Sequence, residues 1–228
     1  MTLQIHTITI GAFNRYLVGD EGWILIDAGI PYTAGRVERT LAWLGVDPRE
    51  VRLILLTHGH IDHAGSASAL QRLTGASVAI HERDRAWVES GYVAVPRMWG
   101  RVGQIAGRPI EWIARAMRFP PVQADVVIGD AGLSLESYGI HGRVIHTPGH
   151  TRGSVSLLLE SGEAFVGDLG GGAHGPGRKP GIPPAGNDRN QILASWERLF
   201  REGVTTIYPG HGPLLPASAM RAALDVRI

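Results

Sequence analysis

The sequence predicts an α/β protein built from stacked layers of sheet and helix. Short runs of aliphatic and β-branched residues recur along the chain, and segments with apolar residues at helical spacing fall between them. Strands that alternate with amphipathic helices bury the apolar face of each element against the next layer. The 228 residues are 44% hydrophobic, which is enough to enclose a sizeable core. We therefore expect a single domain over residues 1–228.

The expected elements follow one another in chain order. Strands are expected at residues 3–10, 16–18, 22–26, 53–56, 77–80, 143–146, 155–159, 164–166 and 206–208. An early helix is indicated by apolar residues that share one face, namely Val37, Leu41 and Leu44. A later helix is indicated by a wider apolar stripe, made up of Ile192, Leu193, Trp196, Leu199 and Phe200. Asn187 or Asp188 is the expected N-cap of this later helix, and Gly203 is its expected end.

A helical insertion is expected at about residues 85–122. Its apolar residues recur at helical spacing in two stretches, Met98–Val102–Ile105 and Ile110–Ile113–Met117. Two short helices are therefore predicted, the second beginning near Pro109. We favour a lid that walls the substrate pocket with the side chains of Met98, Trp99, Trp112, Met117 and Phe119. A homodimer interface, simple core packing and a basic amphipathic helix on a membrane are the alternatives.

Four candidate metal ligands lie within six residues, directly after the apolar run Leu53–Leu56. They are His58, His60, Asp62 and His63. Three imidazoles and a carboxylate are costly to desolvate unless something binds them, and a divalent metal is the usual partner. The i, i+2 spacing of His58 and His60 suits an extended segment, in which alternate side chains point the same way. The alternative is a polar loop whose histidines only form hydrogen bonds.

Three further candidates lie downstream, each after a strand-like run and in a glycine-rich turn. They are His150, Asp168 and His211. Loops at the ends of strands are where α/β proteins present functional groups, so these positions favour a shared site. The remaining histidines lack such a motif and are expected to be structural: His6, His81, His141 and His146. In the loop at residues 170–186, His174, Arg178 and Lys179 are either solvated surface residues or substrate contacts.

In these motifs the chain resembles the metallo-β-lactamase-fold hydrolases. An HxHxDH loop, a TPGHT turn, a strand ending in Gly-Asp and a PGHG turn occur in the order typical of that family. The resemblance implies a four-layer αββα sandwich with the insertion near the active site. It implies that His58, His60 and His150 hold one metal, that Asp62, His63 and His211 hold a second, and that Asp168 bridges them. Asp27 is expected to support the site through hydrogen bonds rather than by ligation.

The expected chemistry follows from such a site. Two zinc ions per chain would share a water, lower its pKa and generate a hydroxide nucleophile that attacks a carbonyl group. Asp62 and Asp168 are the expected catalytic residues, Asp62 orienting the water and Asp168 holding the ions together. The expected substrate is a carboxylic ester, lactone or thioester with an apolar portion, with β-lactam cleavage as a side activity. Iron or manganese fits the same ligands. The alternatives are a mononuclear iron enzyme resembling persulfide dioxygenases and a non-catalytic metal-dependent binding or sensor protein.

The composition and the first residues of the chain bear on its partners, its chemistry and its location. The formal charge is +1, with 22 basic and 21 acidic residues, so no strong field favours nucleic acid as a partner. The chain has no cysteine, which excludes disulfides, thiolate ligands and a cysteine nucleophile. The first ten residues lack the pattern of a signal peptide, so a cytoplasmic location without membrane attachment is expected.

Overall fold

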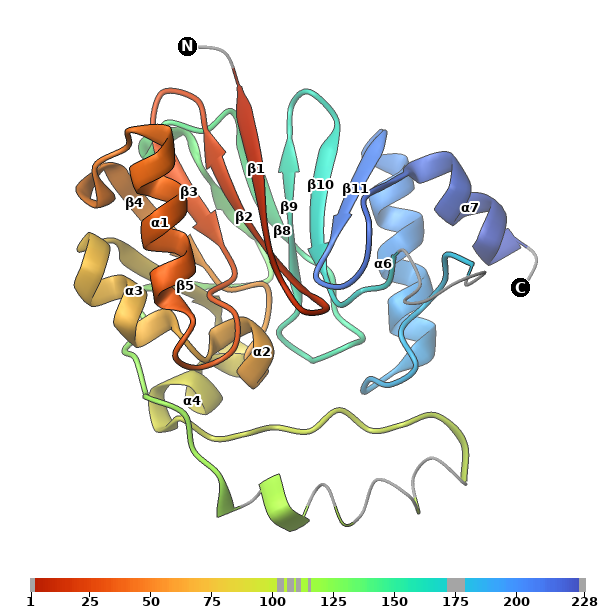
Figure 1. The fold of residues 1–228 in the computed structure, drawn as a ribbon. Coiled ribbons are helices and arrows are strands. Elements are labelled where there is room, and N and C mark those ends of the chain that lie inside the picture. The colour runs from red at the N-terminus through yellow and green to blue at the C-terminus, as the bar shows by residue number, and fades with distance from the viewer. Residues whose placement is uncertain are drawn as a thin grey trace.

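Two mixed β-sheets form the centre of the molecule (Figure 1). The computed structural model describes residues 3–101, 105, 109, 112–114, 116–171 and 179–225. The first sheet has the order β1-β2-β3-β4-β5-β6, with the bounds Gln4–Ile10, Phe13–Gly19, Trp23–Ile26, Val51–Leu55, Ser77–His81 and Val126–Ile128. The second has the order β12-β11-β10-β9-β8-β7, with the bounds Leu215–Pro216, Thr206–Pro209, Glu163–Gly167, Val155–Leu159, Gly142–His146 and Leu133–Ser134. Strands β3 to β6 run parallel to one another, and β10 runs parallel to β11.

Helices cover the outer face of each sheet. They are α1 (Ala34–Leu44), α2 (Ile61–Ala64), α3 (Ala67–Thr74), α4 (Glu82–Ser90), α6 (Arg189–Arg201) and α7 (Ala217–Asp225). Helices α1 and α3 lie on the first sheet, and α6 and α7 lie beside the second (Figure 1). In the part of the chain that the structure describes, no helix is long and apolar enough to cross a bilayer.

Side chains alternate between two cores along each central strand. In β4, Leu53 and Leu55 pack between the sheets, whereas Ile54 packs toward α1 and α3. In β9, Leu157 faces the other sheet, whereas Leu158 packs toward α6 and α7. This period of two buries both faces of each sheet, so three apolar layers hold four structural layers together. The predicted four-layer αββα sandwich is confirmed.

The expected strands and both expected helices are present. Strands β6, β7 and β12 were not predicted, because two or three residues are too short to show a period. Asp188 caps α6, since its carboxylate accepts hydrogen bonds from the amides of Asn190 and Gln191. Gly203 follows the end of α6 with φ of 81°, in the left-handed conformation expected after a helix.

The insertion differs in part from its prediction. Residues 85–90 belong to α4, and Met98 forms an isolated bridge with Ala185. The described residues 100, 101, 105, 109, 112–114 and 116 are helical, as predicted. Phe119 is buried in the apolar core that also contains residues of α1 and α3. Trp112 and Met117 are exposed. The predicted positions Val102 and Ile110 lie outside the described residues.

Candidate metal centre

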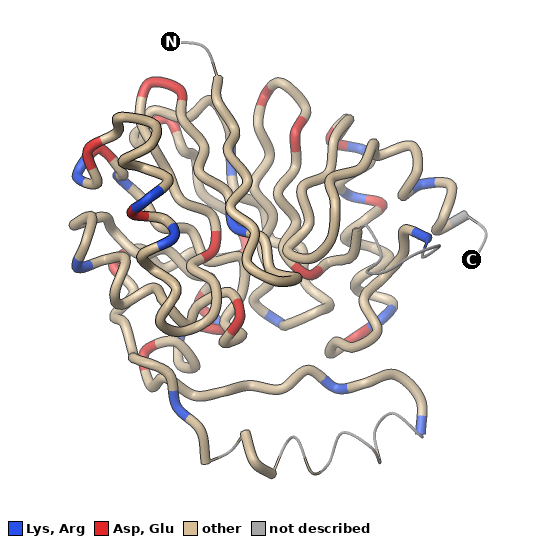
Figure 2. The backbone as a smooth tube through the Cα atoms, in the orientation of Figure 1, with Lys and Arg blue, Asp and Glu red and all other residues tan. Residues whose placement is uncertain are grey.

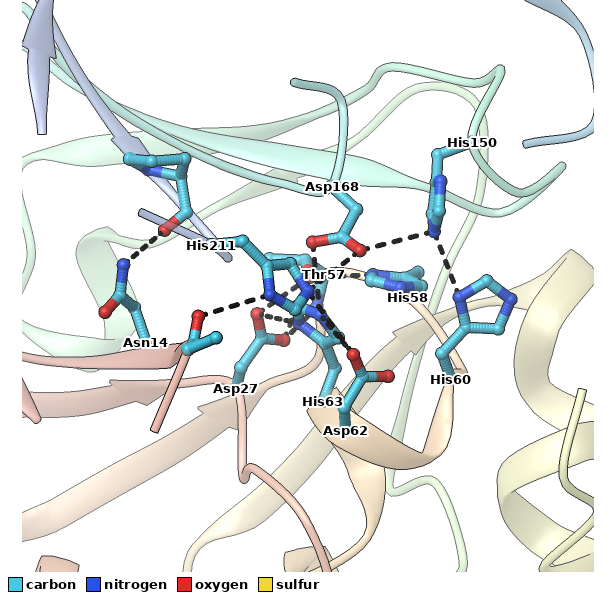
Figure 3. A network of polar contacts seen from close by, with 12 residues as sticks. Asn14, Asp27, Thr57, His58, His60, Asp62, His63, His150, Asp168 and His211 are labelled. Atoms are coloured by element: carbon cyan, nitrogen blue, oxygen red, sulfur yellow. Dashed lines mark hydrogen bonds and ion pairs between the residues drawn. The ribbon is translucent and has the colours of Figure 1, made fainter. Parts of the chain in front are cut away.

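All seven predicted ligands converge at one edge of the sandwich (Figure 3). The loop after β4 carries His58 and His60, and the short helix α2 carries Asp62 and His63. The second sheet contributes the other three from the turn between β8 and β9, the end of β10 and the end of β11: His150, Asp168 and His211. The site therefore forms only when the two sheets pack together.

One cluster consists of three buried histidines, His58, His60 and His150. The Nδ1 atom of His150 donates to the Ala185 carbonyl at 3.1 Å, so its Nε2 lone pair faces His60 Nδ1, 3.0 Å away. Burial lowers the pKa of His60 to about 3 and the pKa of His58 well below its usual range. These rings are therefore neutral at physiological pH, the protonation state in which imidazole binds a metal.

A second cluster combines carboxylates and histidines, namely Asp62, His63, Asp168 and His211. The Nδ1 atom of His63 donates to Asp27 at 2.7 Å, and its Nε2 lies 3.2 Å from Asp168 Oδ1. The Nδ1 atom of His211 contacts the Ala12 carbonyl at 3.2 Å, and its Nε2 lies 3.3 Å from Asp62 Oδ2. Each ring thus uses one nitrogen for the protein and directs the other toward the carboxylates.

The electrostatics of this second cluster favour a bound cation. Burial opposes a charge on His211, but hydrogen bonds to Asp168 and Asp62 outweigh it and raise its pKa to about 9. Burial also opposes a charge on His63, yet Asp168, Asp27 and Asp62 raise its pKa well above the usual value. Burial would raise the pKa of Asp168, but the neighbouring His63 and His211 hold it well below its usual range. Without metal, protons on the two histidines therefore neutralise the carboxylates.

Asp168 lies between the two clusters. Its Oδ2 atom is 3.2 Å from His211 Nε2 and 3.5 Å from His150 Nε2. A single carboxylate therefore reaches a histidine of each cluster, the arrangement that a bridging ligand needs.

Two observations test whether these residues fit a divalent metal. Among the described residues, His58 Nε2 is a buried polar atom without a hydrogen-bond partner, and the buried atoms His63 Nε2 and Asp168 Oδ1 have only their mutual contact at 3.2 Å, which is costly unless a ligand satisfies them. A Cβ atom added at Gly210 would lie 2.5 Å from Asp168 Oδ1 and 2.6 Å from His63 Cε1, so glycine keeps the space beside these ligands open. Imidazole and carboxylate donors suit a divalent transition metal, so the residues fit a metal site.

Asp27 supports the site as expected. Its Oδ1 atom accepts hydrogen bonds from the Thr57 amide at 2.8 Å and the Thr57 hydroxyl at 2.9 Å, while Oδ2 accepts from His63. This contact fixes the tautomer and the orientation of the His63 ring.

Asp84 and Trp87 of α4, which no sequence motif indicates, also contact residues of the metal centre. The Asp84 carboxylate accepts hydrogen bonds from the Gly59 amide at 3.1 Å and from the Thr151 hydroxyl at 2.6 Å, which joins the loops that carry His58 and His150. The Trp87 ring stacks on His60, with 6.0 Å between ring centres and 6° between planes.

His81 and His146, expected to be structural, stack on each other and contact Asp130. His81 Nε2 and His146 Nδ1 lie 3.2 and 3.0 Å from Asp130 Oδ1, and Arg83 donates to Asp130 Oδ2 at 2.7 Å. Because the arginine already supplies a cation, we assign no metal to this group. In the loop after Asp168, the candidates His174 and Arg178 lie outside the described residues, and Lys179 is exposed.

Comparison with known proteins agrees with this geometry. The profile of the family described as "Metallo-beta-lactamase superfamily" matches residues 12–211. The chain belongs to the metallo-beta-lactamase superfamily. Its histidine and aspartate cluster is a metal site of the kind typical of this superfamily.

Several proteins are similar to this chain over most of its length. "Probable metallo-hydrolase MJ0888" of Methanocaldococcus jannaschii is 28% identical over 88% of this chain and 88% of its own length. "Hydroxyacylglutathione hydrolase GloC" of Haemophilus influenzae is 28% identical over 74% of this chain and 72% of its own. "Probable metallo-hydrolase YflN" of Bacillus subtilis is 26% identical over 71% of this chain, and the match spans only 62% of YflN.

A solved structure supports the superfamily fold independently. The BLEG-1 B3 metallo-beta-lactamase has a TM-score of 0.71 and 23% identity, and the match covers 96% of this chain and 97% of that protein. At this level of identity the likeness concerns the fold alone.

Proposed function

We propose that this protein is a dinuclear zinc-dependent hydrolase that cleaves a carboxylic ester, lactone or thioester. The observation that carries the proposal is the convergence of two ligand clusters on one shared carboxylate, Asp168. Its similarity to a hydroxyacylglutathione hydrolase supports thioesters among the candidate bonds. The substrate is a small molecule with an apolar portion, and β-lactam cleavage is a side activity.

The proposed ligand sets are His58, His60 and His150 for one ion and Asp62, His63 and His211 for the other, with Asp168 shared. Divalent cations at these positions supply Lewis acidity and lower the pKa of water, so the protein itself needs no covalent nucleophile. The Asp62 side chain is 23% exposed, against 12% for Asp168. Asp62 is thus the carboxylate that an incoming water reaches first, and we assign it the orientation of that water. Asp168 has the smaller exposed fraction, and we assign it the role of holding the two clusters together.

The test combines metal analysis with two substitutions. Protein purified without added metal should contain about two zinc ions per chain and hydrolyse members of a panel of esters, lactones and thioesters. His60→Ala and His150→Ala should each lower the metal content and reduce turnover by at least about a hundredfold, because each removes a ligand to the same ion. His6 provides the control, because this half-buried histidine of β1 belongs to neither ligand cluster, and His6→Ala should leave both quantities unchanged.

Three results would contradict the proposal. Unchanged turnover in His60→Ala would exclude the ligand role. One iron per chain, with oxygen uptake in the presence of persulfide, would favour the oxygenase. Bound metal without turnover of any substrate in the panel would favour the sensor.

A further inference from the structure

A pocket beside the metal centre is lined by three arginines. It has a volume of about 930 Å³, a size typical of small-molecule sites. The residues that line it include Arg83, Arg97, Arg152, Trp87 and Asn187. These arginines come from α4, from the segment after α4 and from the turn after His150, so the fold rather than any local motif gathers them.

Two residues of the pocket wall contact the first ligand cluster or the turn that carries it. The Trp87 ring stacks on His60, and the Asn187 amide donates to the carbonyls of Gly149 and His150 at 2.9 and 3.0 Å. A molecule in this pocket therefore lies against the groups that position two proposed metal ligands. The pocket is placed to hold a part of the substrate away from the bond that is cleaved.

Three arginines and two carboxylates line the pocket, a formal excess of one positive charge. Asp84 accepts hydrogen bonds from Thr151 and two backbone amides, and Asp188 caps α6, so within the described chain neither carboxylate forms an ion pair with an arginine of the pocket. Within the described part of the chain, Arg97 and Arg152 form no ion pair. Arg83 is oriented by its bond to Asp130, at 2.7 Å. Two guanidinium groups thus remain available to an anion.

The segment beneath the sandwich strengthens this field. Among its described residues, from Gly91 to Phe119, the only charged side chains are basic, namely Arg97, Arg101 and Arg118, and Figure 2 shows no acidic position there. Over the rest of the described chain, acidic and basic positions are interspersed (Figure 2). The excess of positive charge is therefore local to the side of the molecule where the metal centre lies.

We propose that this arginine-lined pocket binds an anionic group of the substrate, a carboxylate or a phosphate, through Arg97 and Arg152. The proposal rests on the hydrolase function proposed above and names the substrate class: an acyl compound that carries an anion some bonds away from the scissile carbonyl. Trp87 lines the pocket and stacks on His60, so its ring provides an apolar surface between the arginines and the metal centre. Such a surface suits the aliphatic chain that joins the anion to the scissile carbonyl.

The test compares two esters of equal chain length, mono-(4-nitrophenyl) glutarate and 4-nitrophenyl pentanoate, after subtraction of spontaneous hydrolysis. Wild-type enzyme should have the higher kcat/KM for the anionic ester, and this ratio should fall as ionic strength rises. In Arg97→Ala/Arg152→Ala the ratio should fall by at least about tenfold, the scale of one lost charge-assisted bond. The double lysine variant should recover part of it. Replacing the terminal carboxylate by a phosphate in the same series decides between the two anions.

Arg39→Ala provides the control, because Arg39 is an exposed arginine of α1 and should leave the ratio at its wild-type value. Equal kcat/KM for the two esters in the wild type, or an unchanged ratio in the double alanine variant, would overturn the pocket assignment while the hydrolase function stands. Failure to hydrolyse either ester, or the matching thioesters, would contradict the hydrolase function instead. In that event calorimetric titration of zinc-loaded protein with glutarate decides the pocket, since equal affinity in wild type and double variant overturns it.

Discussion

At the scale of single residues, Asp27 shows how strongly the centre depends on groups that do not ligate. Its backbone has φ of 61°, a conformation that asparagine also tolerates, so Asp27→Asn removes the charge with little strain. The His63 ring then loses its carboxylate partner, and we expect zinc affinity to fall by about 10- to 100-fold. Titration against a chromogenic chelator measures this change. Asp47→Asn is the control, because Asp47 caps an exposed turn and asparagine caps equally well. Equal affinities in Asp27→Asn and wild type would refute the supporting role.

Protonation gives a second prediction for individual side chains. In the metal-free protein His211 has a pKa of about 9, whereas His60 has one of about 3. At pH 7 a metal entering the second cluster must therefore displace protons, and one entering the first need not. Calorimetry of zinc binding in buffers of different ionisation enthalpy should show proton release at pH 7 that decreases toward pH 10. Proton release that stays constant over this range would contradict the assignment.

The same shift makes the metal-free fold sensitive to pH. The pKa of His211 is raised above its unfolded value of 6.5, so its contribution to stability is complete below pH 6.5 and is lost as pH rises through about 9. Bound zinc replaces the proton in this role. The fold with metal should therefore lose less stability over that range than the fold without it.

At the scale of elements, helix α6 supports the turn that carries His150. The Asp188 amide donates to the Gly149 carbonyl at 2.9 Å, and the Ser195 hydroxyl donates to the Pro148 carbonyl at 2.8 Å. Gly149 has φ of 138°, and a Cβ atom there would lie 2.5 Å from the Ile192 amide nitrogen. Only glycine lets the helix approach so closely, which explains the glycine before the ligand.

The cap of α6 can be tested separately from the turn. Asp188→Ala removes two hydrogen bonds from the first turn of the helix but keeps the backbone contact to Gly149. We expect a loss of about 1 kcal/mol in the free energy of unfolding, or about 2–4 °C in Tm, with metal content unchanged. Thermal denaturation and metal analysis measure the two quantities. An unchanged Tm would show that the cap contributes nothing, and a loss of metal would show that the carboxylate itself holds the His150 turn.

Prediction from sequence succeeded for elements and residues whose signals are local. Strand β4 leads into the continuous apolar run Leu53–Leu56, and His58 to His63 follow it within a few positions, so the pattern alone indicates the loop. The contribution of Asp84 has no such signal, because its partner Thr151 is 67 residues away. The arginines of the pocket are likewise scattered along the chain. Short strands such as β7 form only because a longer neighbour pairs with them.

At the scale of the whole molecule, the metal centre joins the two halves of the sandwich. The first sheet supplies His58, His60, Asp62 and His63, and the second supplies His150, Asp168 and His211. Bound metal should therefore stabilise the packing of one sheet against the other, and the unfolded chain cannot offer these ligands together. With free zinc at about 1,000 times its dissociation constant, the expected stabilisation is about 4 kcal/mol, or about 8–16 °C in Tm.

Removal and return of the metal test this coupling between site and fold. Protein dialysed against a chelator should remain folded, because its three apolar cores are intact, but should melt at a lower temperature by about that amount. Added Zn²⁺ should restore Tm, whereas Mg²⁺, which prefers oxygen ligands, should restore much less. His58→Ala, with a ligand of the first cluster removed, should show a smaller zinc-dependent rise in Tm. If the melting temperature is the same with zinc and with chelator, the two sheets are held by their apolar cores alone, and the seven side chains do not bind a metal that bridges them.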